Sequence, residues 1–259
     1  MAQREFCAAE RDGHVLTVTI GRPELRNALH PPAHDELAEV FDAFEADPEL
    51  WVAVVTGAGN EAFCAGQDLK WVAAGNAPTV PASGFGGLTA RYGIVKPVVA
   101  AVNGVAMGGG FEIALACDLI IASERARFGL PEPRVGLAAL AGGIHRLPRQ
   151  IGLKPAMGML LTGRAVDAAE GERLGFVNEV VPHDELAAAT GRWVEKILAC
   201  APLSVRASKQ AAMQGLDAPT LQQAVEGRYD QVRAMLKSAD FREGPRAFAE
   251  KRPPRWQGR

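Results

Sequence analysis

The chain has 259 residues, 48% of them hydrophobic and 22% charged, so it can bury a sizeable core as one large domain or two small ones. A net charge of −2 and a pI near 6.2 exclude a global field that would attract nucleic acid or an anionic membrane. The cysteines are scattered without a CxxC pair, which predicts no metal site and no disulfide framework. Reduced thiols, no apolar leader and no apolar run of membrane-spanning length favour a cytoplasmic protein. The cysteines are Cys7, Cys64, Cys117 and Cys200.

The first half of the chain predicts strands separated by helices. Residues 14–20 are rich in β-branched side chains and predict a strand, and residues 33–46 carry apolar residues at helical spacing before Pro48. Short continuous apolar runs follow, and they are typical of strands covered on both faces in a parallel α/β sheet. These runs are residues 51–56, 97–102 and 118–122.

Residues 70–96, between two of these runs, are rich in glycine and proline, which indicates a mobile surface loop with at most a short helix, of the kind that covers a ligand. After about Gly142 the chain predicts mainly helices. A sheet-rich first part and a helix-rich last third predict one α/β core with a helical extension. The expected helices are 153–162, 168–174, 184–200, 203–214 and 221–238.

Residues 62–70, AFCAGQDLK, follow a predicted strand and form the first candidate motif. Small residues and a glycine let the backbone approach a ligand closely, although a tight structural turn uses the same residues. The preceding glycines match the loose form of a dinucleotide-binding fingerprint. That fingerprint requires an acidic residue about 20 positions on, and none lies between Asp68 and Glu112, so NAD or FAD binding is not expected.

Residues 103–112, NGVAMGGGFE, lead from a strand into an apolar helix. Unpaired N–H groups at such a helix start can hold a negative oxygen, although glycines there also allow close helix–strand packing. No Gly-Lys-Ser/Thr follows, so a P-loop is excluded.

The third motif, FGLPE at residues 128–132, places a second carboxylate beside a bend. A lone glutamate in a loop is commonly solvated surface. Two carboxylates near such bends can act as general acid and base if their environments separate their pKa values. The sequence has no GxSxG or HExxH motif, and Pro31 and Pro32 are expected to keep His30 and His34 off a common helical face.

The ordered motifs AFCAGxDL, KPVVAAVNGxAxGGGFE, CDLIIAS and FGLPE resemble those of the enoyl-CoA hydratase (crotonase) superfamily, and the likeness covers nearly the whole chain. The resemblance implies one crotonase-type α/β domain over residues 1–259. Its core, about residues 1–200, would be a spiral of ββα units, and about residues 201–259 would form a helical C-terminal trimerisation region. The family usually assembles as a trimer or a dimer of trimers.

The resemblance also implies the site. The thioester oxygen of a 2-enoyl-CoA would lie between the backbone N–H groups of Gln67 and Gly109. Glu112 would activate water for attack at Cβ, and Glu132 would protonate Cα; having both glutamates favours hydratase or dehydratase chemistry. No cofactor is expected, because coenzyme A is part of the substrate. The residues expected to contact coenzyme A are Arg26, Ala65, Asp68, Leu69, Lys70 and, from a neighbouring subunit, Phe248 and Lys251.

The acyl pocket is expected to include Trp71, Phe85 and Leu140. Hydratases often carry Pro-Gly-x-Gly-Gly after the second glutamate, whereas residues 139–143 are ALAGG, so Leu140 replaces a glycine. Residues 83–89 and the C-terminal sequence resemble those of carnitinyl-CoA dehydratases. If this chain acts on the same substrate, its Trp71, Phe85 and Tyr92 could surround the quaternary ammonium. The sequence therefore predicts an enoyl-CoA hydratase. The alternatives are a carnitinyl-CoA dehydratase (crotonobetainyl-CoA hydratase) and a non-catalytic acyl-CoA-binding or RNA-binding member of the fold; the acidic charge argues against the RNA-binding role.

Overall fold

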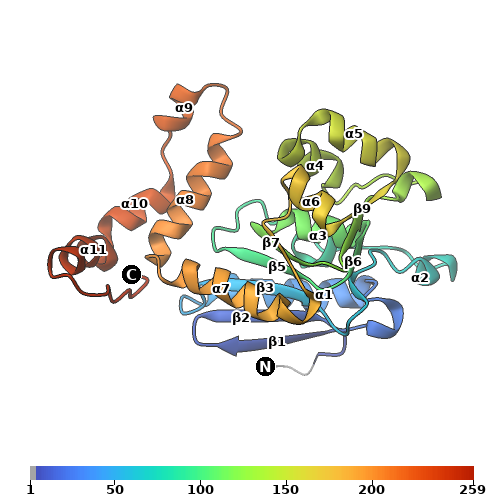
Figure 1. The fold of residues 1–259 in the computed structure, drawn as a ribbon, viewed down its shortest axis with the longest axis horizontal. Helices are drawn as coiled ribbons and strands as arrows, with labels where there is room; N and C mark the ends of the chain where they lie inside the picture. Colours follow the sequence, from blue (N-terminus) through green and yellow to red (C-terminus); the bar gives the residue numbers. More distant parts are fainter. Residues whose placement is uncertain (1–3) are drawn as a thin grey trace.

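The computed structural model describes residues 4–259 as two β-sheets with helices packed around them (Figure 1). The first sheet has the strand order β1-β2-β3-β5-β7-β10, and the second has the order β4-β6-β8-β9. The strands are β1 (Cys7–Asp12), β2 (Val15–Ile20), β3 (Val52–Gly57), β4 (Ala62–Cys64), β5 (Val98–Val102), β6 (Val105–Met107), β7 (Leu119–Ser123), β8 (Arg127–Gly129), β9 (Ala165–Asp167) and β10 (Glu179–Val181). The helices are α1 (Pro31–Ala46), α2 (Leu69–Ala73), α3 (Gly109–Ala116), α4 (Gly143–Ile151), α5 (Leu153–Thr162), α6 (Ala168–Leu174), α7 (Leu186–Leu198), α8 (Pro202–Gly215), α9 (Leu221–Val225), α10 (Asp230–Lys237) and α11 (Ala239–Ala249).

Successive strand pairs alternate between the two sheets. β3, β5 and β7 lie side by side in the first sheet, and the strands that directly follow them, β4, β6 and β8, lie side by side in the second. The pairings among β3, β5 and β7 and among β4, β6 and β8 are all parallel. The first two pairs lead into α2 and α3. This arrangement confirms the predicted spiral of ββα units.

The β5 strand shows why an unbroken apolar run predicts a central strand, because all five of its residues are buried. Val98, Ala100 and Val102 face the main core, which also contains side chains from α1. Val99 and Ala101 point to the opposite face, where they pack with residues of α7 such as Ala189. A strand covered on both faces cannot show alternation of apolar and polar residues.

The structure corrects three predictions about elements. The expected helix over residues 221–238 is two helices, α9 and α10, separated by a turn in which the Tyr229 hydroxyl donates to the Ala224 carbonyl. Only the exposed part of the 70–96 segment is a surface loop, because residues 85–89 are buried. Pro31 and Pro32 begin α1 and do not interrupt it, because proline is tolerated in the first helical turn. His30 is the N-cap residue, and His34 lies buried in the first turn.

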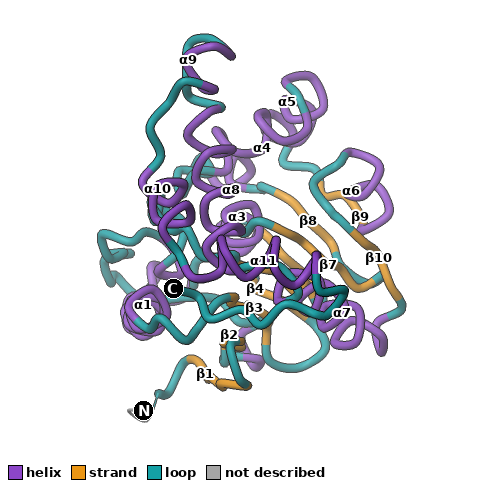
Figure 2. Tube along the Cα trace, turned by 90° about the vertical axis from the view of Figure 1, so that its left-hand side faces the viewer, coloured by secondary structure: helices purple, strands orange, loops and turns teal. Residues whose placement is uncertain are grey.

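The last four helices, α8 to α11, lie to one side of the two sheets (Figure 1). Figure 2, viewed from that side, shows the same helices in front of the core. Large apolar side chains on this helical region are exposed in the single chain: Met213, Leu216, Leu221, Val225, Leu236, Phe241 and Phe248. Over residues 4–259, no helix is both long and apolar enough to cross a membrane.

Candidate active site

Leu29 makes three hydrogen bonds to the loop between β4 and α2. The Leu29 N–H donates to the Gly66 carbonyl at 2.8 Å, and the Leu29 carbonyl accepts the Asp68 N–H at 2.8 Å and the Gln67 amide Nε2 at 3.2 Å. Gly66 has a φ of 92°, a left-handed conformation that favours glycine. Within residues 4–259, the backbone N–H of Gln67 has no hydrogen-bond acceptor, so it is free to bind a ligand oxygen.

The start of α3 brings a second free N–H to the same place. Gly109 is the first helical residue, and its N–H has no acceptor among the residues described. A Cβ atom added to Gly66 would lie 3.1 Å from the Gly109 nitrogen, so the two segments are in direct contact. A Cβ at Gly110 would collide with the Cys64 carbonyl. The glycines therefore have both roles considered from the sequence. They allow close packing of the two segments, and that packing brings the N–H groups of Gln67 and Gly109 to one place.

Glu112 lies in the first turn of α3 and is 3% exposed. Its Oε1 accepts the backbone N–H of Gly143 at 2.8 Å. Burial raises the pKa of Glu112 to about 7, and the negative charge of Glu132 adds to the rise. The Gly143 N–H and the Arg146 guanidinium act in the opposite direction. A carboxyl group with this pKa can accept and release a proton near neutral pH.

Glu132 begins a 3-10 helix that follows β8. A Cβ atom at Gly108 would lie 3.0 Å from the Glu132 Oε1, so this carboxylate lies against the glycines that precede Glu112. Burial raises its pKa, and its buried Oε2 has no hydrogen-bond partner in the described part of the chain. Both conditions favour the protonated acid.

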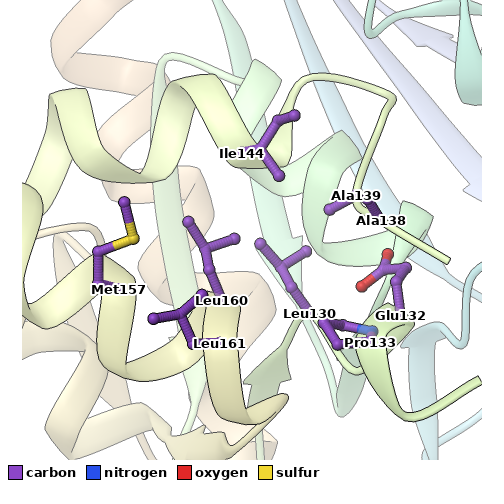
Figure 3. A pocket seen from close by; sticks show the side chains of 9 residues that line it. All are labelled: Leu130, Glu132, Pro133, Ala138, Ala139, Ile144, Met157, Leu160 and Leu161. Atoms are coloured by element: carbon purple, nitrogen blue, oxygen red, sulfur yellow. The ribbon is translucent and has the colours of Figure 1, made fainter. Parts of the chain in front are cut away.

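The Glu132 side chain lines an apolar cavity of about 270 Å³ and points toward Ala138 and Ala139 (Figure 3). The opposite wall comes from α4 and α5. The remaining lining residues are Leu130, Pro133, Ile144, Met157, Leu160 and Leu161. Apart from Glu132, every side chain that lines this cavity is apolar.

The residues expected to contact coenzyme A near the first motif lie together. The Ala65 N–H donates to the Arg26 carbonyl at 3.0 Å, and the Arg26 side chain is largely exposed, 3.5 Å from Glu61. Leu69 and Lys70 are also exposed. The side chain of Asp68 is different: it caps α2 by accepting the N–H groups of Lys70 and Trp71. It also pairs with Arg22 at 3.0 Å, so its carboxylate is already engaged within the chain.

The three aromatic residues proposed for an ammonium site have different surroundings in the single chain. Phe85 is buried against Gly109 and makes an edge contact with His34. Trp71 makes an edge contact with His30. Tyr92 is 84% exposed, and the guanidinium of Arg146 already lies 5.8 Å from its ring centre.

Leu140, expected in the acyl pocket, lies at the surface of the single chain, and its role in the pocket stays a prediction. Its side chain is 78% exposed and does not line the cavity beside Glu132. The backbone turns sharply here, because the Leu140 N–H donates to the Ala138 carbonyl. This turn directs the neighbouring alanines, and not Leu140, toward the cavity.

Phe248, in α11, and Lys251, just after it, belong to the helical region beside the core, and both are exposed. Their expected role was on a neighbouring subunit. That role stays a prediction.

Sequence reasoning missed two residues near the catalytic carboxyl groups and the segments around them. Gly143 holds Glu112 through its N–H, and Arg146 binds the carbonyls of Thr89 and Ala141. The Gly142–Gly143 pair was visible in the sequence as part of a motif, but the direction of an N–H group was not.

Two sheets in a ββα spiral, with two free N–H groups, a buried carboxyl group and a half-buried one at one place, define a crotonase-fold protein. The family model described as "Enoyl-CoA hydratase/isomerase" matches residues 10–259, and the chain belongs to this family. Carnitinyl-CoA dehydratase of Proteus mirabilis is 43% identical over 257 residues, covering 95% of this chain and 96% of the relative. The protein of that name from Escherichia coli O157:H7 is 41% identical over 259 residues, covering 96% and 97%.

Solved structures agree with this assignment. An enoyl-CoA hydratase from Mycobacterium marinum has a TM-score of 0.91 and 38% identity, covering 98% of this chain and 99% of that one. An enoyl-CoA hydratase from Bacillus anthracis has a TM-score of 0.91 and 33% identity, covering 98% and 100%.

Proposed function

We propose that the protein is an enoyl-CoA hydratase that adds water reversibly across the Cα–Cβ double bond of a 2-enoyl-CoA thioester. The observation that carries this proposal is that Glu112 and Glu132 lie close to each other at the glycine-rich start of α3, where the N–H of Gly109 is free. Hydration requires a base for water, an acid for Cα and a site for negative charge. The chain supplies all three.

The mechanism follows from the electron flow. The thioester oxygen accepts the N–H groups of Gln67 and Gly109. Ionised Glu112 takes a proton from water, and the water oxygen bonds to Cβ while the double-bond electrons move to that thioester oxygen. The resulting enolate collapses as Glu132 donates its proton to Cα. Losing one oxyanion donor in other enzymes costs about 10²–10³ in rate, so this pair would be a large part of the acceleration.

The proposal extends to coenzyme A and assembly. Arg26, Leu69 and Lys70 are exposed beside the loop that carries the free Gln67 N–H, and together with the backbone at Ala65 they would hold coenzyme A. The exposed apolar residues of α8 to α11 support self-association as a trimer or dimer of trimers, because such surfaces mark protein interfaces. A neighbouring subunit would then supply Phe248 and Lys251. The reaction would need no cofactor, and we place it in the cytoplasm.

A carnitinyl-CoA dehydratase is the second candidate, and the names of the curated relatives favour it. The apolar cavity beside Glu132 favours an uncharged acyl group. A purely binding role gives no reason for two neighbouring carboxyl groups whose pKa values are both raised by burial.

The deciding experiment is a panel of enoyl-CoA thioesters, including crotonyl-CoA, a branched enoyl-CoA and crotonobetainyl-CoA, followed by loss of the conjugated-enoyl absorbance. We expect the highest kcat/KM with an uncharged acyl group. A preference for crotonobetainyl-CoA would establish the second candidate. Tight binding of thioesters without turnover would establish the non-catalytic role.

A further inference from the structure

Arg146, in the first turn of α4, joins two segments that are far apart in the sequence. Its Nη2 donates to the carbonyl of Thr89 at 2.7 Å, and its Nη1 donates to the carbonyl of Ala141 at 3.3 Å. Thr89 is buried and ends the segment that begins with Phe85, whose ring covers Gly109. Ala141 precedes the two glycines at the start of α4. One guanidinium therefore holds both the segment that packs over Gly109 and the turn that leads to Gly143.

The contact with Ala141 bears directly on Glu112. Gly142 has a φ of 107°, and a Cβ atom there would collide with the Arg146 guanidinium. The next residue, Gly143, donates its N–H to Glu112 at 2.8 Å. The guanidinium thus sets the path of the backbone immediately before the peptide group that holds the carboxylate.

The charge of Arg146 is not neutralised locally. Among residues 4–259, its guanidinium is hydrogen-bonded only to carbonyl oxygens, and it is half-buried. The titratable groups that act on it are Tyr92, Glu112 and Cys117. Glu112 in turn is affected by two charged groups, Glu132 and Arg146, which act in opposite directions. A half-buried cation without an ion pair favours negative charge nearby, and Glu112 is the carboxyl group on which it acts.

We propose that Arg146 is a positioning residue for the hydration reaction: its two carbonyl bonds fix the Gly142–Gly143 turn that orients Glu112, and its charge favours the ionised base. This role rests on the proposed function, in which Glu112 is the base of the hydration reaction. Arginine suits it because the planar fork reaches two carbonyls at once and stays charged when half-buried.

The test compares Arg146→Gln, Arg146→Lys and the control Arg149→Gln, which removes an exposed guanidinium bonded to the His145 carbonyl on the same helix. For Arg146→Gln we expect kcat/KM at neutral pH to fall about 10²-fold, the cost of a misplaced catalytic group. The acidic limb of its pH profile should move to higher pH, because a cation that favoured ionised Glu112 has been removed. Arg146→Lys should keep the limb and lose part of kcat with KM unchanged. The control should match wild type.

An acidic limb that stays in place in Arg146→Gln overturns the proposal, whatever the rate. If circular dichroism shows that this variant does not fold, Arg146→Lys decides, and a wild-type kcat in it overturns the proposal. A second measurement needs no substrate: the infrared carboxylate band of Glu112, isolated by difference from Glu112→Gln, should titrate at higher pH in Arg146→Gln. Failure of the wild type to hydrate any enoyl-CoA would reject the proposed function and leave this titration as the test of Arg146.

Discussion

Glu112 is buried and Glu132 is half-buried, and the chain treats their oxygens differently. Glu112 accepts the Gly143 N–H, which stabilises its ionised form, whereas the buried Oε2 of Glu132 has no partner. A carboxylate that accepts an N–H from a neighbouring segment is suited to be the base, and one with a buried, unpartnered oxygen is suited to hold a proton. The local hydrogen bonds therefore agree with the roles expected from the family resemblance.

We predict that Glu112→Gln and Glu132→Gln each lower kcat by about 10²–10⁴, because each removes one proton-transfer group. Glutamine keeps the shape and, at position 112, an oxygen that can accept the Gly143 N–H. The measurement is steady-state hydration of the preferred enoyl-CoA. Glu172→Gln, which changes an exposed carboxylate, is the control and should turn over like wild type. Near-normal turnover in either active-site variant would remove that residue from the mechanism.

The burial of Glu112 predicts that the group needed for activity lowers the stability of the fold at high pH. Its folded-state pKa of about 7 lies above the ordinary value of 4.5, so the folded protein binds this proton more tightly than the unfolded chain. Stability is therefore lost as pH rises from about 4.5 through about 7. Glu112→Gln should be more stable than wild type at about pH 8, by up to about 3 kcal/mol, and nearly equal at about pH 4. Guanidinium chloride unfolding at both pH values measures this; equal stability at the higher pH would contradict it.

At the level of residues, the sequence could predict the glutamates because their chemistry and spacing are visible in it. It could not predict Gly143 or Arg146, whose roles depend on where an N–H or a guanidinium points after the chain has turned. Leu140 shows the same limit. Its position near the site was evident, but the turn between Ala138 and Gly142 decides which side chains face the cavity.

At the level of elements, the contact between α3 and β4 is the tightest constraint on the site. Gly110→Ala would place a methyl group on the Cys64 carbonyl, so α3 would have to move and carry Gly109 with it. We expect a loss of about 1–3 kcal/mol in stability, typical of overpacking, together with a fall in kcat. The matched control is Gly191→Ala in α7, where an added methyl meets no atom within 4 Å. It should raise stability by about 0.5–1 kcal/mol, as thermal unfolding of both variants would show.

The elements that the sequence predicts well are those with enough residues to show a pattern. The buried β5 run and the helical spacing of α1 are examples. The three-residue strands β4, β6 and β8 show no period, and the ladders they make with distant segments define them. Residues 85–89 have a loop-like composition, yet tertiary packing against α1 and α3 buries them.

At the level of the whole molecule, the helical region beside the core predicts dependence on assembly. Lys251→Ala should raise KM for coenzyme A substrates more than it lowers kcat, because it would remove binding common to the ground and transition states. Lys237→Ala, an exposed lysine in α10, is the control and should leave KM unchanged. Sedimentation should show a trimer or a dimer of trimers for all three proteins. A fully active monomer would contradict the prediction.

The cysteines give the molecule one addressable thiol. Cys7, Cys64 and Cys117 are buried, and burial raises the pKa of the first two to about 12. Buried thiols of this kind are inert to alkylating reagents. Cys200 is exposed in the short connection between α7 and α8, where the core meets the helical region. A spin label would therefore mark each subunit once, at that junction. A three-fold assembly would give a single distance between labels, whereas a dimer of trimers would add further distances between its halves.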